Sequence, residues 1–313
     1  MLRRWSALLL CALICATSAR AVSTDDDDDG HIRPTGVHKR HRSSKTKSAA
    51  PEEEIAPAIP VVPTQPSDPA RVPNTRAVSV LVVDARSGQV LTEKNADQPR
   101  PAASTQKLLT ALIVAETGYL NRLVTVEATD TFAEPVKLGI RPGETYQRID
   151  LLRALLVKSP NDVARCLARD NAGSVEAFAG KMNTKAEQLG ATHSHFLNPN
   201  GLPIPGQYST ARDLSVIARA AYSNPTIRSI VCLPQLVFRY ANGRTRELEN
   251  TNKVLKRFPF CNGMKTGYTE AAGHCLIASG SRPGRDVIVV VLGDTKSGVW
   301  SDAASLLSWS LWL

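Results

Sequence analysis

The sequence is poor in the residues that bind metals and redox groups. Six of its 313 residues are cysteine and six are histidine. The four cysteines after residue 76 form no Cys-x-x-Cys pair or Cys/His spacing typical of zinc ligands. His31, His38 and His41 lie near a run of aspartates and could bind a metal, but a solvated, disordered segment is the simpler interpretation. Aromatic residues make up only 5%, and no helical segment carries a basic face interleaved with them. These absences speak against a metal, a cofactor and a nucleic-acid partner.

The sequence also lacks an apolar run long enough to cross a membrane. Its clearest run covers residues 5–16, follows Arg3 and Arg4, and precedes Ala19-Arg20-Ala21. A basic start, a short apolar run and an A-x-A site are typical of a cleaved secretory signal. We therefore predict that residues 1–21 are a signal peptide. The mature protein is expected in the periplasm or cell envelope, without a transmembrane anchor.

Residues 22–76 lack the composition of a folded core. Five consecutive aspartates at 25–29 precede the basic stretch HIRPTGVHKRHRSSKTKS, and a segment with a proline every few residues follows. Separated charge blocks and frequent proline cannot bury enough apolar surface to offset chain entropy. We predict a disordered, semi-extended tether, which either holds the domain away from an attachment point or lets its basic half touch an anionic envelope polymer.

The net charge is modest. The chain carries 38 lysines and arginines against 29 acidic residues, a formal charge of +9. Removing Arg3, Arg4 and Arg20 with the signal leaves 35 basic against 29 acidic residues, about +6. This excess favours acidic wall polymers or an anionic membrane surface over nucleic acid as the partner.

Residues 77–313 have the length of one domain. Four cysteines remain after signal cleavage, an even number that permits two disulfides in three connectivities. Each also has apolar neighbours, so buried free thiols are an equal alternative. These cysteines are Cys166, Cys232, Cys261 and Cys275.

Strand patterns lie at both ends of this domain, and helical patterns lie between them. The last strands are joined by short turns, which favours antiparallel pairing. We therefore predict an α+β fold, with an antiparallel sheet completed by the N-terminal hairpin and a helical subdomain beside it. The expected strands are 77–85, 88–95, 235–241, 263–267, 274–280 and 286–293, and the expected helices are 103–116, 149–158, 161–172, 175–190, 210–223 and 300–312.

Ser104 and Lys107 lie three residues apart at the start of a predicted helix. This spacing places both side chains on one helix face. A serine hydroxyl becomes a nucleophile when a base takes its proton, and a lysine whose amine is neutral can be that base. Alternatively, Ser104 and Thr105 are ordinary capping residues and Lys107 is solvated.

A second polar group breaks the helical pattern at Ser159-Pro160-Asn161. A hydroxyl and an amide on a rigid corner can relay a proton and bind a substrate amide. The simpler interpretation is a helix N-cap with proline at the first turn and Asp162 stabilising the helix dipole.

The stretch CNGMKTGYT at 261–269 combines Lys265, Thr266 and Gly267 on a predicted strand. Glycine lets another backbone or a ligand approach a strand closely. The neighbouring lysine and threonine offer charge and hydrogen bonds. The pattern indicates one wall of a binding site for an anionic, extended ligand.

The three groups occur in the order S-x-x-K, S-x-N and K-T-G, at a helix start, an inter-helix corner and a strand. This order is typical of penicillin-recognising serine enzymes. From residue 77 onward the chain closely resembles the D-alanyl-D-alanine carboxypeptidases, the low-molecular-mass penicillin-binding proteins. The likeness extends to NADQPRPAASTQK, LGATHSHFLNPNGLPIPGQYSTARDLS and KTGYTEAAGHCLIAS.

The resemblance implies a role for each motif. Ser104 is the implied nucleophile, Lys107 the implied base, and Ser159 a relay for the proton. The implied contacts with the substrate come from the following residues: Asn161, Lys265, Thr266, Gly267, Tyr268 and Arg212. The backbone N–H groups of Ser104 and Tyr268 are the implied oxyanion hole. Arg212 resembles an arginine that shapes the anion-binding end, but it also fits an ordinary helix surface.

Two features depart from the family pattern. Pro160 stands where relatives usually have a small residue, which is expected to stiffen the corner and alter rates. The chain stops one helix after its last strand, without the second β-rich domain of some relatives. We expect the apolar terminal stretch SLLSWSLWL to be a core-packing helix rather than a membrane segment.

The resemblance implies a secreted serine D,D-carboxypeptidase that removes the terminal D-Ala from peptidoglycan stem peptides and is acylated by β-lactams. A D,D-endopeptidase acting on cross-links has the same motifs. A β-lactamase of class A needs a glutamate on a loop between the second and third motifs, and the candidates lie in helices or strands. These candidates are Glu176, Glu187, Glu247 and Glu249. A wall-binding module with a decayed site disagrees with the intact motifs.

Overall fold

The computed structural model describes residues 65–313. The predicted signal peptide and residues 22–64 of the predicted tether lie outside the described residues. Within the described range, no helix has the length and apolarity needed to cross a membrane.

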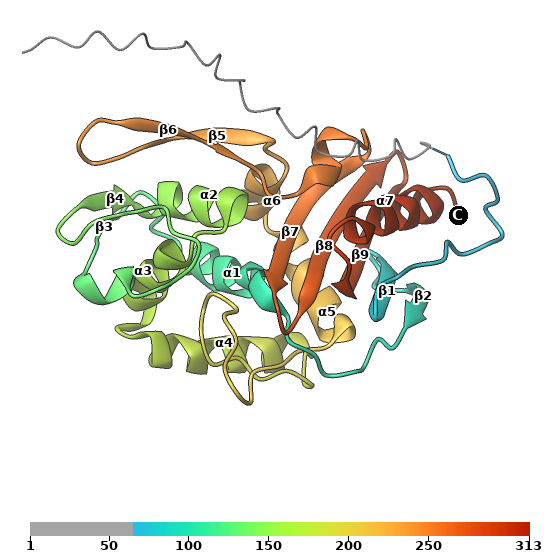
Figure 1. Ribbon diagram of the computed structural model, residues 1–313, viewed down its shortest axis with the longest axis horizontal. Coiled ribbons are helices and arrows are strands. Elements are labelled where there is room, and N and C mark those ends of the chain that lie inside the picture. Colours follow the sequence, from blue (N-terminus) through green and yellow to red (C-terminus); the bar gives the residue numbers. More distant parts are fainter. Residues whose placement is uncertain (1–64) are drawn as a thin grey trace, which may run out of the picture. The chain divides into compact units, whose positions relative to one another are not determined.

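A five-stranded antiparallel sheet forms the centre of the described chain (Figure 1), in the order β2-β1-β9-β8-β7. The hairpin β1 (Ser79–Asp84) and β2 (Val90–Lys94) pairs with the C-terminal strands through β1 and β9. The C-terminal strands are β7 (Cys261–Thr269), β8 (Gly273–Arg282) and β9 (Arg285–Asp294). Both the hairpin and its place in the sheet confirm the predicted arrangement.

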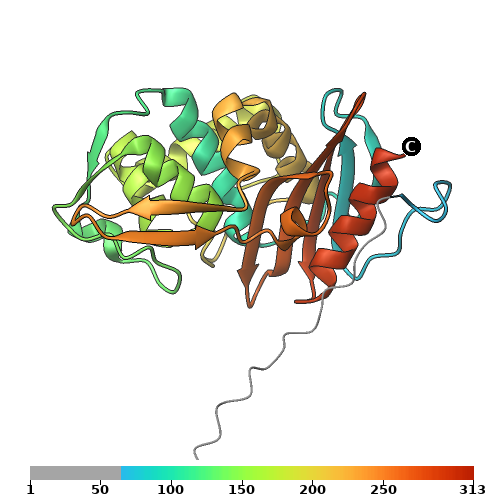
Figure 2. The ribbon, with the colours of Figure 1, turned by 90° about the horizontal axis from the view of Figure 1, so that it is seen from above.

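Both faces of this sheet are covered by helices (Figure 2). Along β9, Val287, Val289 and Val291 pack into the apolar cluster that includes α7 (Gly298–Leu311). The alternate residues of β9 belong to the larger core, which includes α5 (Ala211–Ser223). Since successive side chains of a strand point to opposite faces, a continuous apolar run is what a doubly covered strand requires.

The helical region surrounds α1 (Lys107–Thr117), of which eight residues are buried. The other helices of this region are α2 (Arg148–Lys158), α3 (Asn161–Ala172), α4 (Val175–Leu189) and α6 (Pro225–Val231). The remaining short elements are β3 (Leu123–Thr125), β4 (Thr145–Gln147), β5 (Gln235–Arg239) and β6 (Thr245–Glu249), with the 3₁₀ turns η2 (Ala128–Thr131) and η3 (Lys253–Lys256). Among these helices and short elements, α6 and all the short elements except β5 were not predicted from the sequence. Such brief segments show too little hydrophobic periodicity.

The start of the predicted helix 103–116 differs from expectation. Residues 103–106 form a separate 3₁₀ helix, η1 (Ala103–Gln106), and the α-helix begins at Lys107. Neither Ser104 nor Thr105 caps it, since Gln106 is the N-cap residue and no side chain forms a cap hydrogen bond. The Thr105 hydroxyl instead donates to the Ala102 carbonyl at 2.5 Å. The Ser104 side chain is therefore left for another role.

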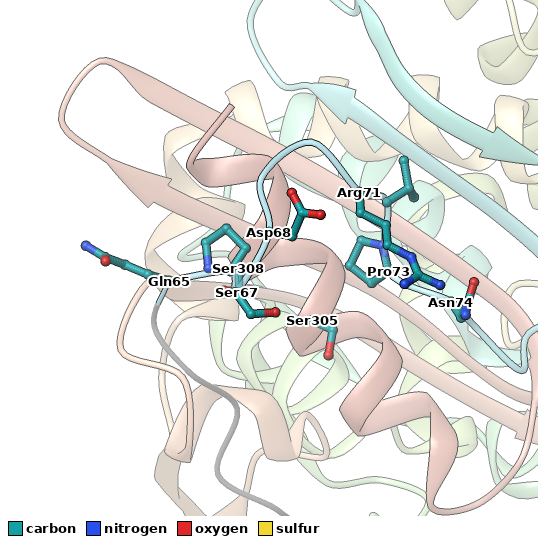
Figure 3. A pocket seen from close by; sticks show the side chains of 10 residues that line it. Gln65, Ser67, Asp68, Arg71, Pro73, Asn74, Ser305 and Ser308 are labelled. Carbon is teal, nitrogen blue, oxygen red and sulfur yellow. The ribbon is translucent and has the colours of Figure 1, made fainter.

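The last residues of the predicted tether contact the domain. The indole N–H of Trp309, on α7, donates to the Pro69 carbonyl at 3.0 Å, and the Arg76 N–H donates to Asp302 at 2.6 Å. Figure 3 shows residues 65–68 and 71–74 lining a pocket together with Ser305 and Ser308 of α7. Contacts with the domain therefore begin before residue 77. The C-terminal helix is also confirmed as a core-packing element, because Leu306, Leu307 and Leu311 are buried.

All four cysteines of the domain are free thiols. Cys166, Cys261 and Cys275 are buried, as one of the two interpretations expected, whereas Cys232 is exposed. Burial raises the pKa of Cys261 and of Cys275 to about 11. These two thiols are therefore protonated and unreactive at neutral pH.

Candidate active site

Ser104 and Lys107 come into direct contact at the junction of η1 and α1. The Lys107 Nζ lies 2.9 Å from the Ser104 Oγ. Ala103 has φ of 47°, in the left-handed region that non-glycine residues seldom adopt. This backbone turn brings Ser104 to the site before the regular helix begins, and the next helical turn carries Lys107 inward.

The Lys107 amine is surrounded by oxygen atoms and shielded from water. Its side chain is fully buried, and its Nζ also lies 2.7 Å from Asn161 Oδ1, 3.0 Å from the Ser159 carbonyl and 3.3 Å from Ser159 Oγ. Burial, followed by the nearby charge of Lys265, holds the pKa of Lys107 well below its usual value of 10.5. A lowered pKa is what a lysine needs in order to accept a proton.

The corner between α2 and α3 forms another side of the site. Ser159 ends α2 in the left-handed conformation, with φ of 66°, and Pro160 is the N-cap of α3. This sharp corner directs both Ser159 and Asn161 towards Lys107. Asp162 is fully buried and accepts hydrogen bonds from the N–H groups of Leu138 and Gly139. Its carboxylate therefore fixes the neighbouring loop, a role that the helix-dipole interpretation did not include.

Strand β7 forms a further side of the site and passes very close to η1. A Cβ at Gly267 would lie 2.8 Å from the Ser104 nitrogen and 3.0 Å from the Thr105 nitrogen, too close for any side chain. The sequence predicted that Gly267 leaves room for a substrate backbone. The structure places the backbone of η1 there, so this glycine sets the distance between Ser104 and β7.

Gly201 makes a similar approach from the other side of η1. It has φ of +82°, and a Cβ there would lie 2.0 Å from the Ala103 carbonyl oxygen. The Ser104 hydroxyl donates to the carbonyl of the adjacent Asn200 at 3.2 Å. Two glycines from distant segments thus enclose the turn that carries Ser104.

Lys265 lies beneath the surface of the site. Its exposure is 1%, its Nζ donates to the Thr266 carbonyl at 2.9 Å, and burial lowers its pKa to about 7. Thr266 is at the surface, where its hydroxyl donates to the Thr251 hydroxyl at 2.6 Å. A ligand in the site would therefore meet Thr251 and Thr266 first, with Lys265 behind them.

These elements enclose a cavity of about 520 Å³. This volume is within the range of small-molecule sites, roughly 300–1,000 Å³. The predicted residues among those that line it are Ser104, Ser159, Asn161, Thr266, Gly267 and Tyr268. Tyr268 is 59% exposed and stacks on His274, with ring centroids 4.3 Å apart. Ser104 therefore lines the cavity together with several hydrogen-bonding groups, and the Lys107 amine, whose pKa is lowered, contacts its hydroxyl from behind.

Comparison with known proteins agrees with this geometry. A family model described as D-alanyl-D-alanine carboxypeptidase, Peptidase_S11, matches residues 64–296. The chain belongs to the D-alanyl-D-alanine carboxypeptidase family. It is an enzyme of the serine-type D-alanyl-D-alanine carboxypeptidase class, and the prediction of this family is confirmed.

Relatives in this family share most of the chain. A D-alanyl-D-alanine carboxypeptidase of Mycobacterium tuberculosis is 38% identical over 251 residues, which cover 78% of this chain and 86% of the relative. A D-alanyl-D-alanine endopeptidase of Escherichia coli K12 is 30% identical over 262 residues, 80% of this chain and 84% of the relative. The crystal structure of a D-alanyl-D-alanine carboxypeptidase from M. tuberculosis H37Rv matches with a TM-score of 0.74 and 38% identity, covering 80% of this chain and 96% of that chain. The predicted α+β penicillin-recognising fold is thereby confirmed.

Three predicted site residues do not line this cavity. Lys107 and Lys265 lie directly behind it, in contact with Ser104 and Thr266, whereas the contacts of Arg212 lie elsewhere. The Arg212 Nε donates to Asp97 Oδ1 at 2.6 Å, and its Nη2 donates to Glu93 Oε2 at 2.7 Å. Both carboxylates come from the β1–β2 hairpin region, and both form salt bridges with the guanidinium. The structure therefore gives Arg212 a role in holding α5 to this region and provides no contact with the family's serine site.

Several residues of the cavity were not found from the sequence. Thr251 comes from the loop after β6, Lys158 from the end of α2, and Trp300 from the first turn of α7. His274 was visible only as part of the matching stretch KTGYTEAAGHCLIAS. Contacts between distant segments bring these residues into the cavity, and such contacts are not visible in the sequence. Only Lys158 and His274 stand near a motif in the sequence, which could have indicated them.

Proposed function

We propose that this chain is a secreted serine D,D-carboxypeptidase that removes the terminal D-Ala from peptidoglycan stem peptides through an acyl-enzyme on Ser104. One observation carries this proposal: a fully buried lysine amine lies 2.9 Å from the hydroxyl of Ser104. Because burial lowers the pKa of Lys107, its neutral amine can take the serine proton. The family relationship supplies the substrate class.

In the first step, the Ser104 Oγ attacks the carbonyl carbon of the penultimate D-Ala, and its proton moves to the Lys107 Nζ. The carbonyl oxygen becomes an oxyanion. The N–H groups of Ser104 and Tyr268 stabilise it, because β7 and η1 are packed together at Gly267. One such donor typically contributes roughly 3–4 kcal/mol to transition-state stabilisation.

In the second step, the C–N bond breaks and terminal D-Ala leaves as an amine that takes up the proton from Lys107. Ser159 relays this proton, since its hydroxyl lies 3.3 Å from the Lys107 Nζ and it lines the cavity. Water then attacks the ester, with Lys107 again as the base. Hydrolysis releases the shortened peptide and restores the Ser104 hydroxyl.

The terminal carboxylate of the substrate binds at Thr251 and Thr266. Lys265 supports this contact from beneath, through the Thr266 carbonyl. Burial lowers the pKa of Lys265 to about 7. An anion nearby favours the charged form of a lysine, so Lys265 takes up a proton when the carboxylate binds. The amide of Asn161 orients the peptide, because its oxygen is already held by Lys107.

β-Lactams enter the same path, since their acid group occupies the carboxylate site and their ring carbonyl acylates Ser104. Slow hydrolysis of this adduct makes them inhibitors. A class A β-lactamase needs an activating glutamate on a loop between its second and third motifs, whereas the glutamate that lines this cavity, Glu270, follows the third motif. None of Glu176, Glu187, Glu247 and Glu249 lines the cavity. A carboxypeptidase is therefore favoured over a β-lactamase.

A D,D-endopeptidase is the second candidate. The similarity to an endopeptidase over 84% of that protein's length supports it. Both activities use the same serine chemistry and differ in whether the leaving amine belongs to free D-Ala or to a cross-linked peptide.

A labelling experiment tests the proposal. Incubation with a fluorescent penicillin is expected to label the wild-type protein covalently and to leave Ser104→Ala unlabelled. Equal labelling of both would remove Ser104 from the mechanism. Mass analysis of products from a pentapeptide and from cross-linked muropeptides then separates the two activities: loss of one D-Ala indicates a carboxypeptidase, and cleavage of the cross-link an endopeptidase.

A further inference from the structure

A second cavity, of about 450 Å³, lies at the opposite end of the central sheet from Ser104. At the serine end, His274 of β8 pairs with Asp294 of β9, and at the far end Ser281 pairs with Asp286. Asp286 lines the second cavity. His274 and Ser281 are separated along β8, and at about 3.4 Å per residue this separation puts the two ends of the sheet roughly 25 Å apart. The second cavity shares no lining residue with the first.

Arginines dominate this second cavity. Arg86, Arg219 and Arg228 line it, with Asp286 as the acidic residue among its lining side chains. Three positive charges thus face one negative charge. Within residues 65–313, neither Arg219 nor Arg228 forms a salt bridge.

Arg219 is held rigidly against the turn between β1 and β2. Its Nε donates to the Ala85 carbonyl at 3.1 Å, and its Nη2 donates to the Arg86 carbonyl at 2.8 Å. A Cβ at Gly88, where φ is +81°, would lie 2.4 Å from Arg219 Nη1. Glycine at position 88 therefore makes room for the guanidinium, and this group is positioned before any ligand arrives.

The other two arginines are also oriented. Arg86 Nε donates to Asp286 Oδ2 at 3.0 Å, and the Tyr222 hydroxyl donates to Asp286 Oδ1 at 3.3 Å. The Arg228 guanidinium lies 4.5 Å above the centre of the Tyr222 ring. Stacking of this kind orients a guanidinium without using its N–H donors.

Most of the N–H donors of these three guanidiniums have no hydrogen-bond partner among residues 65–313. A guanidinium has five N–H donors in a fixed fork. The contacts above use two donors of Arg219 and one of Arg86. Such forks match the oxygen atoms of phosphate and carboxylate groups. The apolar residues Leu189 and Val216 line the same cavity and offer a surface for an uncharged part of a ligand.

We propose that this arginine cavity binds a small ligand that carries an oxyanion, either a phosphate or a carboxylate, at a site separate from the serine chemistry. The proposal is independent of the proposed peptidase function, because it uses none of the residues around Ser104. Binding here would give the enzyme a second point of contact with an anionic molecule while the peptide occupies the first cavity.

Calorimetric titration of the full chain tests this site with three probes: glucose 6-phosphate, glucuronate and glucose. We expect saturable binding of at least one of the two charged sugars and none of glucose. The charged sugar that binds more tightly identifies the preferred oxyanion. Arg228→Gln, at an exposed position, is expected to weaken binding about tenfold or more, since bonds to charged groups are lost. Arg86→Gln should have a similar effect.

The matched control is Arg212→Gln, whose guanidinium already has two carboxylate partners. This variant is expected to bind the charged sugar as the wild type does. Penicillin labelling of Arg228→Gln should remain at the wild-type level, which shows that the variant is folded. The proposal is overturned if neither charged sugar binds, if glucose binds equally well, or if folded Arg228→Gln binds like the wild type.

Discussion

The two ends of the central sheet hold their positive side chains in opposite ways. At the serine end, Lys107 and Lys265 are 0% and 1% exposed, and burial lowers the pKa of both amines. At the far end, Arg86 and Arg228 are exposed. A buried amine can lose its proton, whereas a guanidinium cannot. The lysine end is therefore suited to proton transfer and the arginine end to holding a fixed negative charge.

The largest difference between the two ends is expected when the positively charged residue at each end is exchanged for the other type. Lys107→Arg keeps the charge but cannot give up its proton, so acylation by penicillin is expected to fall by roughly 10²–10⁴-fold, the contribution of a general base. Lys107→Ala should be equally impaired. At the far end, Arg228→Lys should leave acylation unchanged.

The measurement is the rate constant of acylation by a fluorescent penicillin for each purified variant. Circular dichroism and thermal unfolding check that Lys107→Arg is folded. Acylation of the arginine variant at near the wild-type rate would remove Lys107 as the base and leave Ser159 as the candidate.

The next largest effect should come from the glycine that brings β7 to Ser104. The Cβ of Gly267→Ala would lie 2.8 Å from the Ser104 nitrogen, so the strand and η1 must move apart. A displacement of about 1 Å can reduce a rate by roughly 10²-fold. The matched control is Gly180→Ala on α4, where a Cβ meets nothing within 4 Å. Equal acylation rates for the two variants would contradict the packing described for β7 and η1.

Lys265 should have a smaller effect, because it acts from beneath Thr266. Lys265→Met keeps an apolar stem and removes the charge that supports the bound carboxylate. A bond to a charged group contributes about 1.5–3 kcal/mol, so we expect acylation to slow by about tenfold or more. Arg212→Met serves as the control and should retain the wild-type rate. If folded Lys265→Met acylates normally while Arg212→Met is slow, the carboxylate binds near Arg212.

Truncation should have the least effect on chemistry, because residues 65–76 contact α7 and none of them lines the cavity at Ser104. A chain that begins at Gln65 is expected to match the full chain in stability and acylation. A chain that begins at Ala77 loses the bonds of Pro69 and Arg76, which should lower the free energy of unfolding by about 1–3 kcal/mol. Its acylation rate should stay within a few-fold of the wild type. Urea denaturation measures this difference, and equal stability of the two chains would show that these contacts contribute nothing.

The serine end was largely predictable from the sequence, because its chemistry depends on local spacing. Ser104 and Lys107 are three residues apart, and Ser159 and Asn161 flank one proline, so each pair is placed by a single turn of chain. Thr251 and Trp300 could not be predicted in this way. Thr251 reaches the cavity because it bonds to Thr266 of β7, and Trp300 reaches it because α7 packs on β8 and β9.

Arg212, in contrast, was assigned to the site from the sequence but lies outside it in the structure. Its place on a helix start was predicted correctly, but the partners of its guanidinium lie more than a hundred residues earlier, at Glu93 and Asp97. The arginine end escaped prediction for the same reason, since Arg86, Arg219 and Arg228 belong to three separate elements. Spacing within a sequence can place neighbours on one face, but it cannot bring such distant charges together.

The pH dependence of Ser104 acylation tests the central claim most directly. The neutral fraction of Lys107 increases as the pH rises through its lowered pKa, so the acylation rate constant should rise with pH and then level off. The midpoint should lie well below the usual lysine value of 10.5, and it reflects the coupled site that includes Lys265. A rate constant that does not change with pH, or one that rises only around 10.5, would contradict the assignment of Lys107 as the base.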